Sequence, residues 1–231
     1  EKLISLGIKL ISINQNEFNA IADLQDSVVV SFCNQAFMEN MEIFKGLNCK
    51  IIWLGCMNKL MSYEVNAFQK GLFPDLFIFQ SNFQKQKIKN ELKSFNYELD
   101  DSFPVIHGAF IEDLFQFRPR PHFNGQPFYV GRAARPAISK WRPDLFYLLS
   151  QVKYSLLGIF LGIDNVVRAR FGFQPIWTAC LRPASIDLRI FYSMLHCFLA
   201  INSSAKENWP RVGLEAMASG VPIVARTDGD G

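Results

Sequence analysis

The sequence lacks an apolar run that could cross a bilayer. The longest such run, around Leu156 to Ile163, falls far short of the roughly 20 residues that a membrane-spanning helix needs. No signal-peptide pattern opens the chain. The formal net charge of +3 is too small to imply a strong field toward nucleic acid or a membrane. We therefore expect a cytoplasmic protein without a nucleic-acid partner, and loose contact with the cytoplasmic face of a membrane stays open.

The spacings of cysteine and histidine that mark a zinc site are absent as well. The cysteines are odd in number and scattered, and no CxxC motif occurs. Most of them lie in apolar segments that resemble strands. We expect buried, reduced thiols that neither bind a metal nor form disulfides. The residues concerned are Cys33, Cys49, Cys56, Cys180 and Cys197.

Apolar and aromatic residues are abundant by contrast. Hydrophobic residues make up 49% of the chain, and 22 residues are phenylalanine, many of them inside apolar runs. At 231 residues the chain can form one large domain or two ordinary ones with a sizeable core. We interpret the phenylalanines as aromatic-rich packing rather than as chemistry.

Strand-like runs alternate with segments of helical spacing along the chain. An alternation every ~20 to 25 residues is typical of βαβ units and a mostly parallel sheet. We expect strands at 26–32, 49–54, 75–80, 105–109, 128–130, 155–163, 197–201 and 221–226. We expect helices at 36–44, 63–71, from the N-cap Ser81 to about 95, from 141 or 143 to 152, and at 187–195, with a further helix end and strand within 2–13.

The composition shifts between Phe115 and Pro127, where three prolines, a glycine and two arginines interrupt the periodicity. Such a stretch favours a linker between domains. After it the alternation of strands and helices restarts. We predict an α/β protein with two Rossmann-like domains that face each other across a cleft, over residues 1–116 and 117–231. The chain begins at Glu1 without methionine and ends in a glycine-rich turn, so we expect a fragment with both domains incomplete.

Candidate binding groups in the second half follow predicted strands, where open α/β sheets bind ligands. Arg132 and Lys140 offer positive charge to an anion, and arginine can grip phosphate oxygens with two donors. Pro210 suits the first position of a helix, which would leave the amides of Arg211 and Val212 directed at a phosphate. This set predicts a diphosphate site.

Two carboxylates bracket the same loop. Glu215, one turn into the helix, could accept bonds from a ribose diol, and Glu207 would face whatever the diphosphate carries. Each residue also has an ordinary structural interpretation. Arg132 could pair with a surface acid, Glu215 could be a helix-surface carboxylate, and Glu207 could be a loop acid near a helix N-terminus.

The E-x7-E pair Glu207 and Glu215, continued by EAMASGVPIVA over 215–225, resembles the donor-site signature of the retaining GT-B glycosyltransferases of family 4. The likeness extends to Gly131-Arg132 with the downstream Lys140, and to Val105–Ala109 with Phe115 as an interdomain segment. It covers residues 105–231 and is faint before them.

The resemblance implies an enzyme that transfers a sugar from a nucleotide diphosphate sugar to a glycan, lipid or other small-molecule acceptor, with retention and without a metal or other cofactor. The first domain would then face the acceptor and the second would bind the donor. The implied catalytic residues are Glu207, Arg132 and Lys140, and the donor-binding residues are Gly131, Arg132, Lys140, Asn208, Arg211, Val212 and Glu215.

Two positions depart from the family pattern. Relatives usually carry a glycine near Pro210, whose amide binds phosphate, and we hypothesise that the Arg211 side chain compensates. The acceptor-side histidine is replaced by the run Gly55 to Asn58. A non-catalytic nucleotide or sugar-binding module and a nucleotide-sugar epimerase stay open as alternatives, because fold analogy alone does not decide function. A phosphorylase of the same two-domain plan would need a lysine for pyridoxal phosphate, and nothing in the sequence marks one out.

Overall fold

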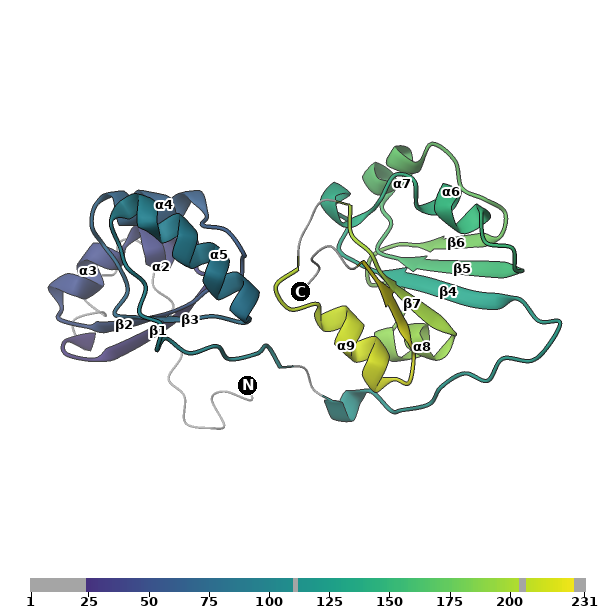
Figure 1. Ribbon diagram of the computed structural model, residues 1–231, viewed down its shortest axis with the longest axis horizontal. Helices are drawn as coiled ribbons and strands as arrows, with labels where there is room; N and C mark the ends of the chain where they lie inside the picture. The colour runs from purple at the N-terminus through teal and green to yellow at the C-terminus, as the bar shows by residue number, and fades with distance from the viewer. Residues whose placement is uncertain (1–23, 110–111, 204–206, 227–231) are drawn as a thin grey trace. The chain divides into compact units, whose positions relative to one another are not determined.

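The computed structural model describes residues 24–109, 112–203 and 207–226 (Figure 1). The chain divides into two compact units, one ending at Ile106 and the other beginning at His107. The helix end and strand expected within 2–13 lie outside the described residues. No helix in the described ranges is both long enough and apolar enough to cross a membrane.

The first unit contains a parallel three-stranded sheet in the order β1-β2-β3. Its strands are β1 Val28–Phe32, β2 Lys50–Leu54 and β3 Leu76–Ile78. Each helix returns the chain to the amino end of the next strand, as parallel pairing requires. The helices are α2 Gln35–Glu39, α3 Met41–Gly46, α4 Ser62–Gln69 and α5 Asn82–Leu92, which continues as a 3-10 turn over Lys93–Phe95.

Aromatic side chains fill the core of the first unit, as predicted. Trp53, Phe68, Phe77 and Phe79 are almost fully buried. The Phe68 and Phe77 rings meet edge to face at 6.1 Å, and Phe77 stacks on Phe79 at 5.9 Å. Such pairs stabilise a core beyond the area that they bury.

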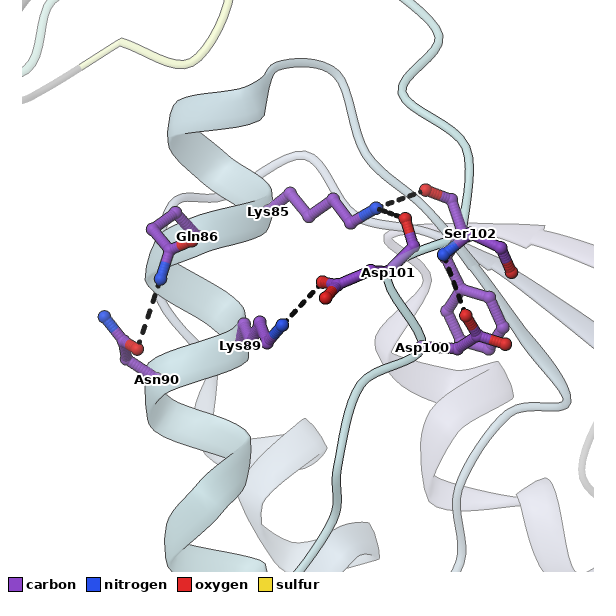
Figure 2. A network of polar contacts seen from close by, with 8 residues as sticks. Lys85, Gln86, Lys89, Asn90, Asp100, Asp101 and Ser102 are labelled. Atoms are coloured by element: carbon purple, nitrogen blue, oxygen red, sulfur yellow. Dashed lines mark hydrogen bonds and ion pairs between the residues drawn. The ribbon is translucent and has the colours of Figure 1, made fainter.

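Lysines on α5 anchor the segment that leads out of the first unit. Ser81 caps this helix as predicted, because its hydroxyl accepts the Gln84 amide at 3.1 Å. Lys85 Nζ donates to the carbonyl oxygens of Asp101 and Phe103, and Lys89 Nζ lies 2.5 Å from Asp101 Oδ1 (Figure 2). A hollow of about 260 Å³ beside this network is lined by none of the predicted site residues; its lining is Lys89, Lys93, Tyr97, Glu98, Leu99 and Asp101.

The second unit contains a parallel five-stranded sheet in the order β6-β5-β4-β7-β8. In Figure 1, α6 and α7 lie on one side of this sheet and α8 and α9 on the other. One hydrophobic core gathers around Trp141 and Phe160, and a second gathers around Phe191 and Phe198. The elements are β4 Phe128–Ala133, α6 Leu145–Ser150, β5 Leu156–Leu161, α7 Asn165–Phe171, β6 Thr178–Leu181, α8 Leu188–Ser193, β7 Cys197–Ala200, α9 Arg211–Ala218 and β8 Ile223–Ala225, with 3-10 turns at Glu112–Leu114 and Ile138–Lys140.

The division between the units falls ten residues earlier than the predicted boundary at 116 and 117. The cause is packing of the proline-rich stretch on the second unit. The Phe115 ring meets Tyr192 at 5.9 Å, and the Arg118 amide donates to the Ser219 carbonyl oxygen at 3.1 Å. Gly220 has a φ of +80°, and a Cβ there would lie 2.8 Å from Pro119 N. The proline-rich stretch therefore packs as part of the second unit and is not a free linker between the two units.

Three of the five cysteines are not buried, which corrects the expectation from the sequence. Cys49 and Cys197 are buried, whereas Cys33, Cys56 and Cys180 are half-buried. None of the five is in a disulfide in this structure. Cys33 and Cys56 each follow a strand, so they lie where the apolar run has ended.

Candidate functional site

The predicted site residues of the second unit start at the carboxyl end of β4, the central strand. Gly131 pairs with Ile159 on one side and Phe198 on the other. A Cβ at Gly131 would lie 2.5 Å from Leu195 Cδ2 and 2.9 Å from the Ile159 carbonyl oxygen. Glycine is therefore needed here for packing, whatever else the residue does.

The Arg132 guanidinium is directed into the protein, with 3% of the residue exposed. Its Nη1 donates to the Leu199 carbonyl oxygen at 2.8 Å, and its Nη2 donates to Lys140 O at 2.7 Å and Asn202 Oδ1 at 2.5 Å. The guanidinium carbon also lies 5.5 Å from the Trp141 ring centroid. These bonds tie the ends of β4 and β7 to the turn that carries Lys140, and they occupy donors that the sequence assigned to a phosphate.

Lys140 and Glu207 form an ion pair across 67 residues of sequence. Lys140 ends the 3-10 turn after β4, and Glu207 lies in the loop after β7, the strand next to β4. Their side chains are 13% and 29% exposed. The structure therefore brings together two residues that the sequence placed in one site, and each neutralises the other here.

The start of α9 differs from the prediction. Pro210 is the N-cap rather than the first helical residue, and α9 begins at Arg211. The Arg211 amide already donates to the Trp209 carbonyl oxygen at 2.9 Å. Within the described ranges no partner is found for the Val212 amide. The predicted pair of outward amides is thus reduced to one.

Glu215 is almost fully buried, with 5% of the residue exposed. The Tyr192 hydroxyl directs its single proton toward Glu215 Oε2 at 3.1 Å and the Val212 carbonyl oxygen at 3.0 Å. Arg211 Nε lies 3.2 Å from Glu215 Oε1. Burial, the charge of Glu215 and the bond to it raise the pKa of Tyr192. Tyr192 was not predicted as a site residue, because an aromatic residue in an apolar helix is usually interpreted as part of the hydrophobic core.

The loop between Glu207 and α9 is braced by the residues that open the second unit. Asn208 is buried, and the Trp209 ring stacks on His107 with centroids 4.5 Å apart. A Cβ at Gly108 would lie 2.6 Å from Trp209 Cδ1. The Trp209 indole N–H is buried and finds no acceptor among the described residues. This contact fixes the backbone next to Glu207.

No three histidine, cysteine or acidic side chains of the described ranges cluster in a way that could hold a metal ion. That the reaction needs no metal stays a prediction. In the first unit, the position of the expected acceptor-side histidine is taken by the run Gly55 to Asn58 after β2, which contains Cys56.

No family model and no curated protein sequence matches the chain. Solved structures do match it. Anabaena Alr3699/HepE in complex with UDP and glucose superposes with a TM-score of 0.69 at 15% identity, over 99% of this chain and 70% of that one. A glycosyltransferase from Rickettsia africae ESF-5 gives 0.71 at 16% identity, over 100% and 69%. The lipopolysaccharide outer core galactosyltransferase WaaB in its apo form gives 0.65 at 13% identity, over 91% and 59%.

At these identities the likeness concerns the fold. The matched proteins are longer, since this chain spans 59% of WaaB and at most 70% of the other two. Both units consist of a parallel sheet with helices that return between its strands. The chain has an α/β fold of two Rossmann-like units, of the GT-B type that glycosyltransferases adopt.

Proposed function

We propose that the chain is part of a glycosyltransferase that takes its sugar from a nucleotide diphosphate sugar. The observation that carries the proposal is the Lys140–Glu207 ion pair at the carboxyl edge of the second sheet. A diphosphate bears more negative charge than a carboxylate, so it competes with Glu207 for the Lys140 ammonium. Binding of the donor then separates the pair and leaves Glu207 available to the sugar.

The residues around this pair support a site for the leaving diphosphate. Arg132 holds the Lys140 carbonyl oxygen at 2.7 Å and so fixes the lysine backbone. The Val212 amide, at the N-terminus of α9, is a donor for a phosphate oxygen. Transfer is accelerated when such groups stabilise the charge that develops on the leaving group. Lys140 and Glu207 are the proposed catalytic residues.

Glu215 is the proposed ribose ligand, and its contact with Arg211 must open when a ribose binds. Its Oε1 is held by Arg211, whose side chain is 68% exposed and can turn away at low cost. Arg211 is then placed to contribute to phosphate binding in place of the amide that Pro210 lacks. Unchanged donor affinity in Arg211→Ala would remove this part of the proposal.

We extend the proposal to hexosyl transfer with retention of configuration and without a metal or cofactor. The second unit binds the donor, and the first unit binds a glycan, lipid or other small-molecule acceptor. HepE, whose solved complexes contain UDP, glucose and UDP-glucose, makes uridine donors the first to try. The anomeric configuration of the product by NMR, and activity in excess chelator, test the finer claims.

The proposal is tested with the full-length protein by thermal shift against uridine-, guanosine- and adenosine-diphosphate sugars. One donor should raise the melting temperature and, with acceptor or water, should release the nucleoside diphosphate. Binding with neither transfer nor hydrolysis would identify a binding module instead. Interconversion of the sugar without release of the diphosphate would identify an epimerase, and the absence of any binding would contradict all three.

A further inference from the structure

Two cysteines that are 23 positions apart meet at the carboxyl edge of the first sheet. β1 ends at Phe32 and is followed directly by Cys33, and β2 ends at Leu54 and is followed by Gly55 and Cys56. Phe32 and Leu54 are paired in neighbouring parallel strands. Both cysteines are half-buried, whereas Cys49 inside the same unit is buried. They are therefore accessible to a small reagent.

Their backbones are held close. Cys33 donates from both its amide, at 3.2 Å, and its thiol, at 3.4 Å, to the Leu54 carbonyl oxygen. Cys33 has a φ of +46°, so the extended conformation of β1 ends there and its side chain does not follow the alternation of faces along the strand. A disulfide spans Cα distances of about 4.4 to 6.8 Å. Peptide mapping of the oxidised chain tests whether the pair meets this requirement.

The two thiols differ in acidity. The Cys33 thiol is within hydrogen-bonding reach of Cys56 as well as of the Leu54 carbonyl oxygen, so its one proton can serve either acceptor; when it is donated to Cys56 it forms a thiol–thiol hydrogen bond. That hydrogen bond lowers the pKa of Cys56, although burial and the nearby Glu64 carboxylate oppose the shift. The same hydrogen bond, together with burial, raises the pKa of Cys33. Since a thiolate is the attacking species, Cys56 is the sulfur that reacts first.

We propose that Cys33 and Cys56 form a reversible disulfide by exchange with a low-molecular-weight disulfide. The Cys56 thiolate attacks one sulfur of the reagent, and the other sulfur leaves as a thiolate that takes up a proton. Cys33 then loses its proton and attacks the Cys56 sulfur of the mixed disulfide, which releases the second thiol. Two protein thiols are oxidised to one disulfide, and one reagent disulfide is reduced to two thiols. The proposal does not rest on the proposed function.

The bridge would connect two turns that the reduced protein joins by hydrogen bonds alone. Cys33 precedes Asn34, the N-cap of α2, and Cys56 lies in the run Gly55 to Asn58. Oxidation would therefore fasten the start of α2 to the loop after β2.

The test treats the chain with oxidised glutathione, removes the excess, and titrates thiols in denaturant. The count should fall from five to three, and return to five after a reducing thiol. Peptide mapping should find Cys33 linked to Cys56. Five remaining thiols, glutathione adducts without a bridge, or a bridge between other cysteines would each overturn the proposal.

Three variants identify the order of attack. Cys33→Ser should stop at a stable glutathione adduct on Cys56, because no second thiol resolves it. Cys56→Ser should react at least tenfold more slowly at Cys33. Cys180→Ser, a half-buried cysteine of the second unit, should still form the bridge. An equally fast adduct on Cys33 in Cys56→Ser would contradict the assigned order, and the peptide map of the unaltered chain decides the bridge itself if a variant does not fold.

Discussion

Glu215, the residue that we propose as the ribose ligand, is buried and is held by partners of its own unit. Tyr192 and Arg211 take one oxygen each. Burying a carboxylate is costly unless it is hydrogen-bonded, so Tyr192 is the residue that makes this placement tolerable. Tyr192 of α8 therefore helps to position the Glu215 carboxylate of α9.

Removal of the Tyr192 hydroxyl tests this dependence. Tyr192→Phe should lower the free energy of unfolding by about 1–3 kcal/mol, since it deprives a buried carboxylate of a donor. Denaturant unfolding by urea measures the change. Tyr147→Phe is the matched control on exposed surface and should stay within about 0.5 kcal/mol. Equal effects of the two substitutions would refute the role of Tyr192.

His196 predicts a dependence of stability on pH. Burial lowers the pKa of His196 from its ordinary value of 6.5. The hydrogen bond to Pro121 opposes this shift, and electrostatic repulsion from Arg120 and His122 adds to it. His196 Nδ1 accepts the Tyr129 amide at 2.9 Å, so the neutral ring is the one that fits. The unfolded chain then binds more protons as the pH falls through about 6.5, and the free energy of unfolding should decrease there.

A variant separates this effect from the general response to acid. His196→Asn keeps an acceptor that can serve the Tyr129 amide but does not titrate. The loss of unfolding free energy between pH 7.5 and pH 5.5 should be smaller in this variant than in the unaltered chain. An identical loss in both would show that His196 is not the group responsible.

At the level of elements, most of the strands were predictable, because β-branched and aromatic runs bounded by polar residues seldom form other structures. The strand expected over 105–109 was wrong: Val105 makes a single parallel bridge to Phe79, and no strand forms there. α7 and β6 were not predicted: β6 has four residues, and α7 has seven, including two adjacent β-branched valines. The expected helix over 36–44 is split at Asn40, which caps one helix at its end and the next at its start. Short elements follow tertiary packing rather than local propensity.

That Lys140 and Glu207 lie close together was predictable for a topological reason. Lys140 and Glu207 follow neighbouring parallel strands, so both had to lie at the same edge of the sheet. The inward direction of Arg132 could not be predicted, because an arginine at a strand end can turn toward a ligand or toward backbone carbonyls. The Tyr192–Glu215 bond joins two helices whose mutual orientation sequence spacing does not encode.

Gly131 tests how tightly β4 is built into the site. Gly131→Ala should destabilise the chain by about 1–3 kcal/mol, because its Cβ would overlap Leu195 and the Ile159 carbonyl oxygen. Gly213→Ala in α9 is the control, since the nearest atom to its Cβ is 4.0 Å away and alanine favours helix. The control should be neutral or stabilising by up to about 1 kcal/mol. An unchanged free energy of unfolding in Gly131→Ala would show that Leu195 and the Ile159 backbone shift to make room for the Cβ.

At the level of the whole molecule, the two units share an architecture of a parallel sheet with connecting helices, but they differ in the side chains at the carboxyl edge of the sheet. The second unit places cationic and acidic side chains at the carboxyl edge of its sheet. At the corresponding edge, the described part of the first unit places Cys33 and Cys56. Likeness to solved glycosyltransferases supports the fold of both units, and the choice of donor and acceptor depends on side chains that this likeness does not match at 13–16% identity.

The account depends most on Lys140 as the residue that binds the diphosphate. Isothermal titration of the full-length protein with the nucleoside diphosphate of its donor measures this directly. Lys140→Gln should weaken binding at least about tenfold, because a charged hydrogen bond contributes about 1.5–3 kcal/mol. Lys153→Gln, in the exposed loop before β5, should bind like the unaltered protein. Equal affinities of Lys140→Gln and Lys153→Gln would contradict the proposed site.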